Sequence, residues 1–334
     1  HVISSSNDRV SHSVQEMALF DIPTTPETNY VADPGGSERR GPDRVTPYLI
    51  NNNIIDEKAA KKELVSKADF DKIAKKFGVS MRTRDKIYTD NFVELAFRAM
   101  HKSYDVEAGI KEAKKLRLFE NSLMQRGAEV KTLDALNFIY NLLFARDVDN
   151  KLVGVVNGLI PDRPEYQYDI RLLKPDIDPG SDLSDVFTDM LKSGSNPVFV
   201  PNGRYHFEKD VTYKNGGIIG TYNTYFTLSA EASIKGERLD NVVFKNFTVR
   251  RLAKQSSKAT IVGYKINNVV VDEITSLDAR TLTSAIYFYS RAGGTNPPLD
   301  DNMARGIIVS NCYIENYTRV NNKGLINPPG TDTN

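Results

Sequence analysis

Residues 181–207 read SDLSDVFTDMLKSGSNPVFVPNGRYHF, and this stretch predicts one helix followed by two short strands. The helix is indicated by apolar residues at the spacing of a single buried helical face, namely Leu183, Val186, Phe187, Met190 and Leu191. Gly194 and Pro197 are expected to end the helix. A Pro-Asn-Gly turn then separates the apolar segment 198–200 from a second strand at 205–207.

Downstream of this stretch, one nine-residue pattern occurs three times. Residues 241–249 read NVVFKNFTV, residues 268–276 read NVVVDEITS and residues 306–314 read GIIVSNCYI, so the copies start 27 and 38 residues apart. Self-similarity at a period of this size is typical of a solenoid, in which each unit buries its apolar face against the next unit. The longer second interval contains an insertion at 290–303 that is rich in Gly, Pro, Asn and Asp, and we expect it to be a surface loop.

Equivalent positions in the three copies predict particular contacts. Val243, Val270 and Ile308 share one position, and we expect them to form a single interior row of stacked parallel strands. Asn246 and Asn311 also share a position, and their amides either hydrogen-bond their counterparts in neighbouring segments or are exposed at turns. A β-sandwich is the rival fold for this region, but the 27-residue period and the preceding helix favour the solenoid.

The short amphipathic helix, the Pro-Asn-Gly turn and the aromatic strand together resemble the entry to the pectate-lyase-like right-handed parallel β-helix. The resemblance implies that the helix caps the open end of the solenoid and that the strand after it begins the first coil. The expected fold class is therefore a multidomain chain, in which a small all-α N-terminal domain precedes a pectate-lyase-like right-handed parallel β-helix. Because the sequence begins without Met and ends within the repeats, we expect it to be a fragment of a longer protein.

The rest of the chain divides into segments by composition. Residues 1–55 are polar and rich in Pro and Gly, and we expect an extended segment that becomes ordered along a partner surface. Residues 56–150 have helical periodicity and predict a small helical domain. Residues 151–180 end in a Pro, Gly and Asp cluster and are expected to be a linker. Residues 181–334 would hold the capping helix and the first coils.

Several apolar residues of the helical segment lie outside the stripes that its helices are expected to bury. They are Phe97, Leu118, Met124, Phe138 and Leu142. A domain of this size has a small core, so apolar residues on second helix faces indicate a contact between subunits. We expect Phe97 and Leu118 in particular to pack against copies of themselves; if the β-helix is a trimer, the simplest closed arrangement places this contact around the same three-fold axis. The alternative is that they fill the core of their own domain.

The totals argue against two classes of partner. The chain has 334 residues, of which 26% are charged, and a net charge of +1, which gives no global reason to expect nucleic acid or membrane binding. No run of about 18 apolar residues is present, so no membrane insertion is expected. Phosphate contacts to DNA would come from the basic residues Lys75, Lys76, Arg82 and Arg84. Acidic residues are interleaved with them, which favours a solvated helix surface and no nucleic-acid partner.

Candidate catalytic residues are the carboxyl groups of the repeat region, because glycan cleavage uses two carboxylates that face one groove. They are Asp272, Glu273, Asp278, Asp300, Asp301 and Glu315. Asp272 and Glu273 are adjacent, so on a strand they would point to opposite faces and could not form the pair. Asp278 and Glu315 lie about one coil apart and are the candidate pair, against the alternative that these groups are solvated turn residues.

No cofactor or metal is expected. The sequence contains no metal motif, P-loop or dinucleotide fingerprint, and its four histidines are scattered, with His206 on a strand face. The glycine-rich segment 215–220 lacks the Lys and the helix that a phosphate loop needs, and we expect it to be a turn. Cys312, the single cysteine, is expected to be a buried and unreactive thiol.

A polar N-terminal segment, a small helical domain and a β-helix, in that order, resemble the tail spikes and the tail or collar appendages of bacteriophages. In that family the N-terminal part is attached to the virion, the β-helix forms a homotrimer, and the protein binds, and often cleaves, a bacterial surface polysaccharide or teichoic acid. The resemblance implies a virion location, a glycan ligand, and tail, collar or portal proteins as partners. It leaves depolymerase activity open, with the active site expected beyond these residues. The alternatives are a free secreted bacterial polysaccharide lyase or hydrolase and a non-catalytic β-helical adhesin.

Overall fold

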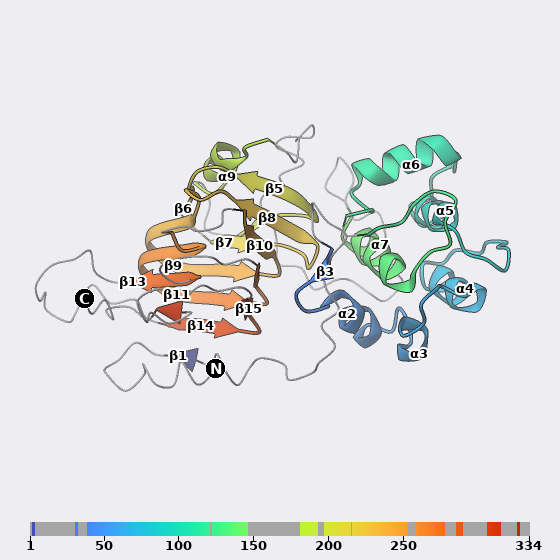
Figure 1. Ribbon diagram of the computed structural model, residues 1–334, viewed down its shortest axis with the longest axis horizontal. Helices are drawn as coiled ribbons and strands as arrows, with labels where there is room; N and C mark the ends of the chain where they lie inside the picture. The colour runs from blue at the N-terminus through green and yellow to red at the C-terminus, as the bar shows by residue number, and fades with distance from the viewer. Residues whose placement is uncertain are drawn as a thin grey trace, which may run out of the picture. The chain divides into compact units, whose positions relative to one another are not determined.

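The structure is a computed structural model that describes residues 2–3, 31–32, 39–120, 122–145, 181–192, 197–214, 216–252, 258–277, 285–289, 306–314 and 326–327. The chain divides into two compact units, one built mainly of strands and one mainly of helices (Figure 1). The candidate catalytic pair Asp278 and Glu315, the predicted linker 151–180 and the predicted insertion 290–303 lie outside the described residues.

The strand unit is built from two sheets. The nine-stranded sheet has the order β1 (Val2–Ile3), β14 (Ile307–Ser310), β11 (Ile261–Asp272), β9 (Ile234–Lys245), β7 (Gly217–Ile219) and β4 (Val198–Phe199), with β6 (Val211–Tyr213), β13 (Ile286–Tyr289) and β16 (Ile326–Asn327) attached beside this path. The five-stranded sheet has the order β15 (Tyr313–Ile314), β12 (Thr275–Leu277), β10 (Thr248–Arg251), β8 (Thr224–Leu228) and β5 (Gly203–Phe207).

The sequence repeats correspond to strands that lie side by side in parallel (Figure 1). Val243 lies opposite Val270, and Val270 lies opposite Ile308, so the prediction that they share one row of parallel strands is confirmed. The prediction that this row is interior is wrong, because all three side chains are only half-buried. The neighbouring rows face the core instead, and their fully buried members include Val242, Val269, Phe244 and Val271.

The predicted helix at the start of this unit is confirmed as α9 (Ser184–Met190). Its Phe187 packs against Phe207 and Phe226, with ring centroids 4.8 and 5.7 Å apart, in the edge-on geometry that aromatic rings prefer. The Asp182 carboxylate accepts hydrogen bonds from the N–H groups of Ser184 and Glu208, at 3.0 and 3.1 Å. This carboxylate therefore joins the start of the helix to the turn after β5.

The predicted fold class is wrong on two points. The described strands do not show a parallel β-helix: they form two sheets of unequal size, the larger curves into a half-barrel, and β1 joins it antiparallel to β14. The long strands β9 and β11 each pair with two separate strands along one edge, so the sheet branches at these strands. The helices also do not form an all-α N-terminal domain, since α9 lies in the strand unit and the helical unit contains β-structure.

The helical unit contains six described helices. They are α2 (Val45–Asn51), α3 (Glu57–Ala60), α4 (Lys67–Lys76), α5 (Thr89–Ala99), α6 (Val106–Lys115) and α7 (Thr132–Phe144). A short antiparallel pair, β2 (Val31–Ala32) and β3 (Arg39–Arg40), and three isolated antiparallel bridges complete it. The unit begins before residue 56, because Tyr48 of α2 packs edge-on against Tyr140 of α7, with ring centroids 5.3 Å apart.

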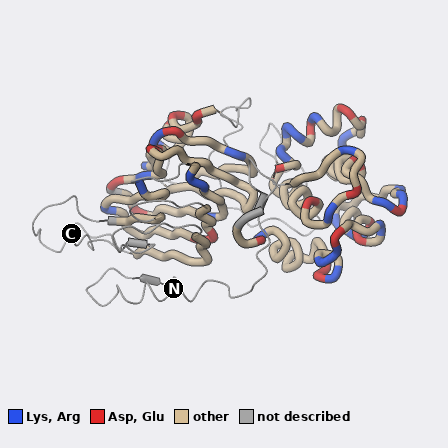
Figure 2. Tube along the Cα trace, viewed as in Figure 1, with Lys and Arg blue, Asp and Glu red and all other residues tan. Residues whose placement is uncertain are grey.

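The helix starts are fixed by side chains of the expected kind. Asp56, Ser66 and Asp105 each accept a hydrogen bond from the backbone N–H three residues later, at 2.8, 3.3 and 2.9 Å. Lys and Arg positions are interspersed with Asp and Glu positions along these helices (Figure 2). Within the described residues, no helix is both long enough and apolar enough to cross a membrane.

Four of the five apolar residues that suggested an intersubunit contact are buried within this unit, and Met124 is half-buried. Leu118, Phe138 and Leu142 are fully buried and Phe97 is 6% exposed. Phe138 packs against Phe92 and Phe119, with ring centroids 6.0 and 5.3 Å apart. The prediction that Phe97 and Leu118 contact copies of themselves is therefore wrong, because both side chains are already covered within one chain and leave almost no surface for a second copy.

Candidate functional site

A row of polar side chains crosses the ends of β9, β11 and β14 on the outer face of the nine-stranded sheet. Lys245, Asp272 and Ser310 lie opposite one another in the parallel register. The Asp272 carboxylate receives Lys245 Nζ at 3.0 Å, Ser310 Oγ at 2.9 Å and Asn311 Nδ2 at 3.1 Å. Asp272 therefore holds three neighbouring segments together, and we call these four residues the Asp272 row.

The charge of this carboxylate follows from its contacts. Burial disfavours the ionised form of Asp272, whose side chain is 16% exposed, but the hydrogen bonds from Lys245, Ser310 and Asn311 outweigh burial and place the pKa of Asp272 below its usual value. Asp272 is therefore ionised at neutral pH, where it accepts hydrogen bonds and has no proton to donate.

The residues that follow Lys245, Asp272 and Ser310 turn the chain in the left-handed conformation. Asn246, Glu273 and Asn311 have φ of 59°, 55° and 51°. Asn tolerates this conformation, whereas Glu does so less readily. At Glu273 the strand alternation therefore stops, and the argument that Asp272 and Glu273 point to opposite faces of a strand does not apply.

Glu273 is held in place by an aromatic residue from an earlier turn. Tyr222 donates its hydroxyl to Glu273 Oε2 at 3.0 Å, although 51 residues separate the two. A residue in a sparsely populated backbone conformation persists only where its surroundings fix it, and such residues are common at functional sites. Together with the Asp272 row, Tyr222 and Glu273 form the polar corner, the candidate functional site of the strand unit.

The structure describes two of the six candidate carboxyl groups, and both lie at the same site. Asp272 and Glu273 both belong to the polar corner, although the sequence reasoning dismissed them as a pair. Asp278, Asp300, Asp301 and Glu315 lie outside the described residues. The sequence reasoning missed Lys245 and Ser310, because a contact between strands depends on register. It also missed Tyr222, which lies outside the repeats and 51 residues from its partner Glu273. Aligning the three copies at Lys245, Asp272 and Ser310 was the signal that could have found the row.

Two expected details of the corner are corrected. Asn246 and Asn311 occupy matching turns, but Glu273 stands between them; Asn311 bonds Asp272, and Asn246 Oδ1 is buried with no hydrogen-bond partner in the described residues. They form no amide ladder. Cys312 is half-buried rather than buried, and its Sγ–H lies 3.2 Å from the carbonyl of Ser310.

None of the described carboxyl groups with a resolved pKa shift has the raised pKa of a general acid. Glycoside hydrolysis needs a general acid whose pKa is raised, so that it keeps its proton at neutral pH. Each described carboxyl group with a resolved shift has a lowered pKa, including Asp182 and Asp272. His206 faces outward from β5, as expected for a strand face, and its Nδ1 lies 2.9 Å from Thr227 Oγ1. The part of the chain with assigned positions holds no group of three His, Cys, Asp or Glu that could bind a metal.

Three comparisons with known proteins give no match. No protein-family model matches the sequence, no curated protein matches it, and no solved structure matches the fold. The function is therefore argued from the residues of the chain alone.

Proposed function

We propose that this chain is part of a bacteriophage tail or collar appendage that adsorbs the particle to a bacterial surface polysaccharide or teichoic acid. The observation that carries the proposal is the polar corner, where ionised, amide and phenolic groups are held at fixed positions across neighbouring strands. A glycan presents many hydroxyl groups, and such a ligand is bound best by acceptors and donors that need no further ordering.

The polar corner supports ligand binding without a catalytic step. Asp272 and Glu273 accept hydrogen bonds from sugar hydroxyls, and Asn311, which is exposed, supplies an amide. Tyr222 supplies an aromatic ring beside Glu273, and rings of this kind pack against apolar faces of a ligand. Adsorption is therefore the activity proposed, and cleavage of the glycan has no support among the described carboxylates.

The test is retention of purified surface glycans by the immobilised protein. A panel of bacterial capsular polysaccharides, wall polysaccharides and teichoic acids is passed over the wild-type chain and over Glu273→Gln and Asn311→Ala. We expect at least one member to bind, and each variant to weaken that binding about tenfold. Lys209→Gln is the matched control, because Lys209 is exposed in the same unit and pairs with Asp185 at 2.8 Å, outside the polar corner. Equal binding by all variants, or no binding across the panel, would contradict the proposal.

We also propose that the adsorbing form is a homotrimer, attached to tail, collar or portal proteins of the virion through its N-terminal region. The contact through Phe97 and Leu118 is excluded by their burial, so the trimer contact is assigned to the strand unit. Light scattering of the purified chain tests this assembly. A mass of three chains is expected, and a concentration-independent monomer would refute it.

A further inference from the structure

The helical unit contains a surface pocket of about 580 Å³ between α4 and the loop that follows α2. Its lining consists of Asn53, Ile54, Ile55, Asp56, Ala59, Asp69, Lys72, Ile73, Lys75 and Lys76. The pocket exists because the chain turns sharply at Asn53, whose φ is 56°, and because the backbone N–H of Ile54 bonds the carbonyl of Leu49 at 2.8 Å. The loop is thereby held apart from α4, and we call this feature the lysine pocket.

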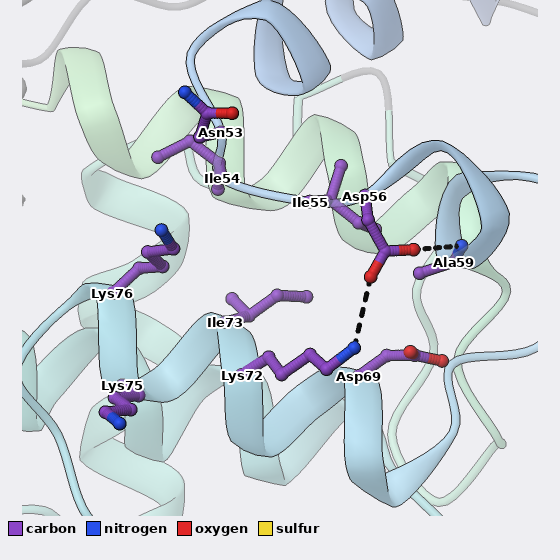
Figure 3. A pocket seen from close by; sticks show the side chains of 10 residues that line it. All are labelled: Asn53, Ile54, Ile55, Asp56, Ala59, Asp69, Lys72, Ile73, Lys75 and Lys76. Atoms are coloured by element: carbon purple, nitrogen blue, oxygen red, sulfur yellow. Dashed lines mark hydrogen bonds and ion pairs between the residues drawn. The ribbon is translucent and has the colours of Figure 1, made fainter.

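The floor of the lysine pocket is aliphatic. Ile54, Ile55 and Ile73 are 3%, 8% and 2% exposed, so they line the pocket while remaining part of the packed unit. Ile73 projects from α4 toward the loop residues Ile54 and Ile55 (Figure 3). An aliphatic side chain of a ligand would find apolar contacts on this floor.

The charges around the pocket do not balance. The Asp56 carboxylate accepts the N–H of Ala59 at 2.8 Å and contacts Lys72 Nζ at 3.1 Å, and these contacts lower its pKa. The Asp69 carboxylate lies 2.5 Å from Lys62 Nζ. Both carboxylates of the lining are thus already neutralised by lysines.

Lys75 and Lys76 carry the excess positive charge. Both side chains are exposed, and neither has an ion pair within the described part of the chain. Lys76 extends toward Asn53 and Ile54, while Lys72 turns to Asp56 at the other end of the pocket (Figure 3). An anionic group is therefore attracted to the Lys76 end, beside the aliphatic floor.

We infer that the lysine pocket binds an acidic peptide segment of a partner protein, with one aliphatic side chain on the floor and carboxylates at Lys75 and Lys76. Lysine amino groups on flexible stems supply charge without fixed geometry, which suits an acidic segment better than a small molecule that must be oriented. This inference concerns a different unit from the polar corner and does not rest on the proposed glycan binding.

The experiment selects ligands from a randomised heptapeptide display library with the full chain as bait. We expect enrichment of peptides that combine Asp or Glu with Leu, Ile or Val. The affinity of an enriched peptide is then measured by fluorescence anisotropy at low and high salt. The double variant Lys75→Gln/Lys76→Gln should weaken binding about tenfold, and high salt should weaken wild-type binding in the same direction.

The matched control is Lys114→Gln/Lys115→Gln, because these lysines also form an exposed pair in the last turn of a helix, α6, away from the pocket. This control should leave peptide affinity unchanged. Equal loss in the two double variants would overturn the inference, since it would indicate general attraction to a basic surface. Failure to enrich acidic-aliphatic peptides would also overturn the inference. Saturable binding of hexanoate, a small aliphatic carboxylate, without any peptide binding would overturn it as well. Circular dichroism confirms that each variant remains folded.

Discussion

Arg251 is a buried cation that joins separate segments of the strand unit. It is 2% exposed, and its guanidinium donates to the carbonyls of Ser229, Ala232 and Ala259 at 2.6, 3.1 and 3.3 Å. Burial lowers the pKa of Arg251 to about 10, so it remains charged at neutral pH. The planar guanidinium spreads five N–H donors over three nitrogens, so it reaches carbonyls that lie farther apart than an ammonium, with three donors on one nitrogen, can contact.

Replacing Arg251 with Met should lower the free energy of unfolding by about 3 kcal/mol, because buried carbonyls lose their donors. Arg251→Lys keeps the charge but reaches fewer carbonyls, and an intermediate loss is expected. Urea unfolding followed by circular dichroism measures both. Wild-type stability in Arg251→Met would show that the carbonyls do not depend on this side chain.

The Asp272 row predicts a pH-dependent contribution to stability. The pKa of Asp272 is lower in the folded chain than in an unfolded one. The contribution of Asp272 to the free energy of unfolding is therefore complete above pH of about 4 and is lost as the pH falls through the folded-state pKa. At neutral pH, Asp272→Asn should cost about 1 kcal/mol, a figure discounted because Lys245 is 40% exposed.

The measurement for this row is the difference in unfolding free energy between wild type and Asp272→Asn across the acid range. We expect the difference to shrink as the pH falls below about 4, because Asp272 takes up a proton in the unfolded chain before it does so in the folded chain. A difference that stays constant through this range would mean that the ionised form of Asp272 is not what the variant removes.

At the residue scale, aligning the repeats predicted which residues lie opposite one another on neighbouring strands. It did not lead to the correct face of the sheet for their side chains. Val242, Val243 and Phe244 form an unbroken apolar run, and a shift of one residue exchanges the two faces of a strand. The polar residue two positions later marks the outward member, since Lys245 shares a face with Val243, but the apolar run was given more weight and Val243 was assigned to the interior. Glu273 was equally hidden, because nothing in its residue type indicates a left-handed turn.

At the element scale, Gly217 lies where β7 approaches β9 most closely. Its φ is 86°, and an added Cβ would lie 2.1 Å from the carbonyl oxygen of Val243. Gly217→Ala should therefore destabilise the strand unit by about 3 kcal/mol, since the backbone of β9 cannot move aside without breaking its pairing.

Gly78→Ala is the control for this substitution. Gly78 also has positive φ, 69°, but an added Cβ there meets nothing within 4 Å. We expect a cost of about 1 kcal/mol from backbone strain alone. Hydrogen exchange with mass spectrometry localises each effect to its own unit. Similar losses at the two positions would show that the close approach to Val243 is unimportant.

Element boundaries were predictable where a residue type enforces them. Glycine after a helical run is a stop signal, and Gly78, with φ of 69°, follows α4. Apolar periodicity continues from Val106 to Leu123, but α6 ends at Lys115, because Arg117 adopts φ of 56°, which periodicity does not reveal. Segment 215–220 was expected to be a turn, but Gly217 begins β7.

At the scale of the whole molecule, the repeats predicted which strands are neighbours but not how the sheet closes. The nine-residue pattern covers only the second part of β9 and β11; their first parts, from Ile234 and Ile261, also lie in register 27 residues apart, but β9 pairs there with β6 and β11 with β13. Sheet closure depends on the pairings of β6 and β13 and on β1, which comes from the far end of the chain. Local periodicity carries no information about either.

The helical unit has a core of its own and should fold without the strand unit. Phe70, Phe92, Phe138 and Leu143 are fully buried within it, and ring contacts of 5.0 and 6.0 Å link the first three. A unit of roughly 100 residues is large enough to be stable, though only marginally. Residues 39–145 expressed alone should therefore show helical circular dichroism and one cooperative thermal transition.

Phe92→Ala should cost about 4 kcal/mol and abolish that transition, because it removes the ring between two others. Glu94→Ala, on the exposed side of the same helix, is the control and should leave it in place, since its ion pair with Arg98 is on the surface. A fragment that unfolds gradually, or that tolerates Phe92→Ala, would show that this core is insufficient.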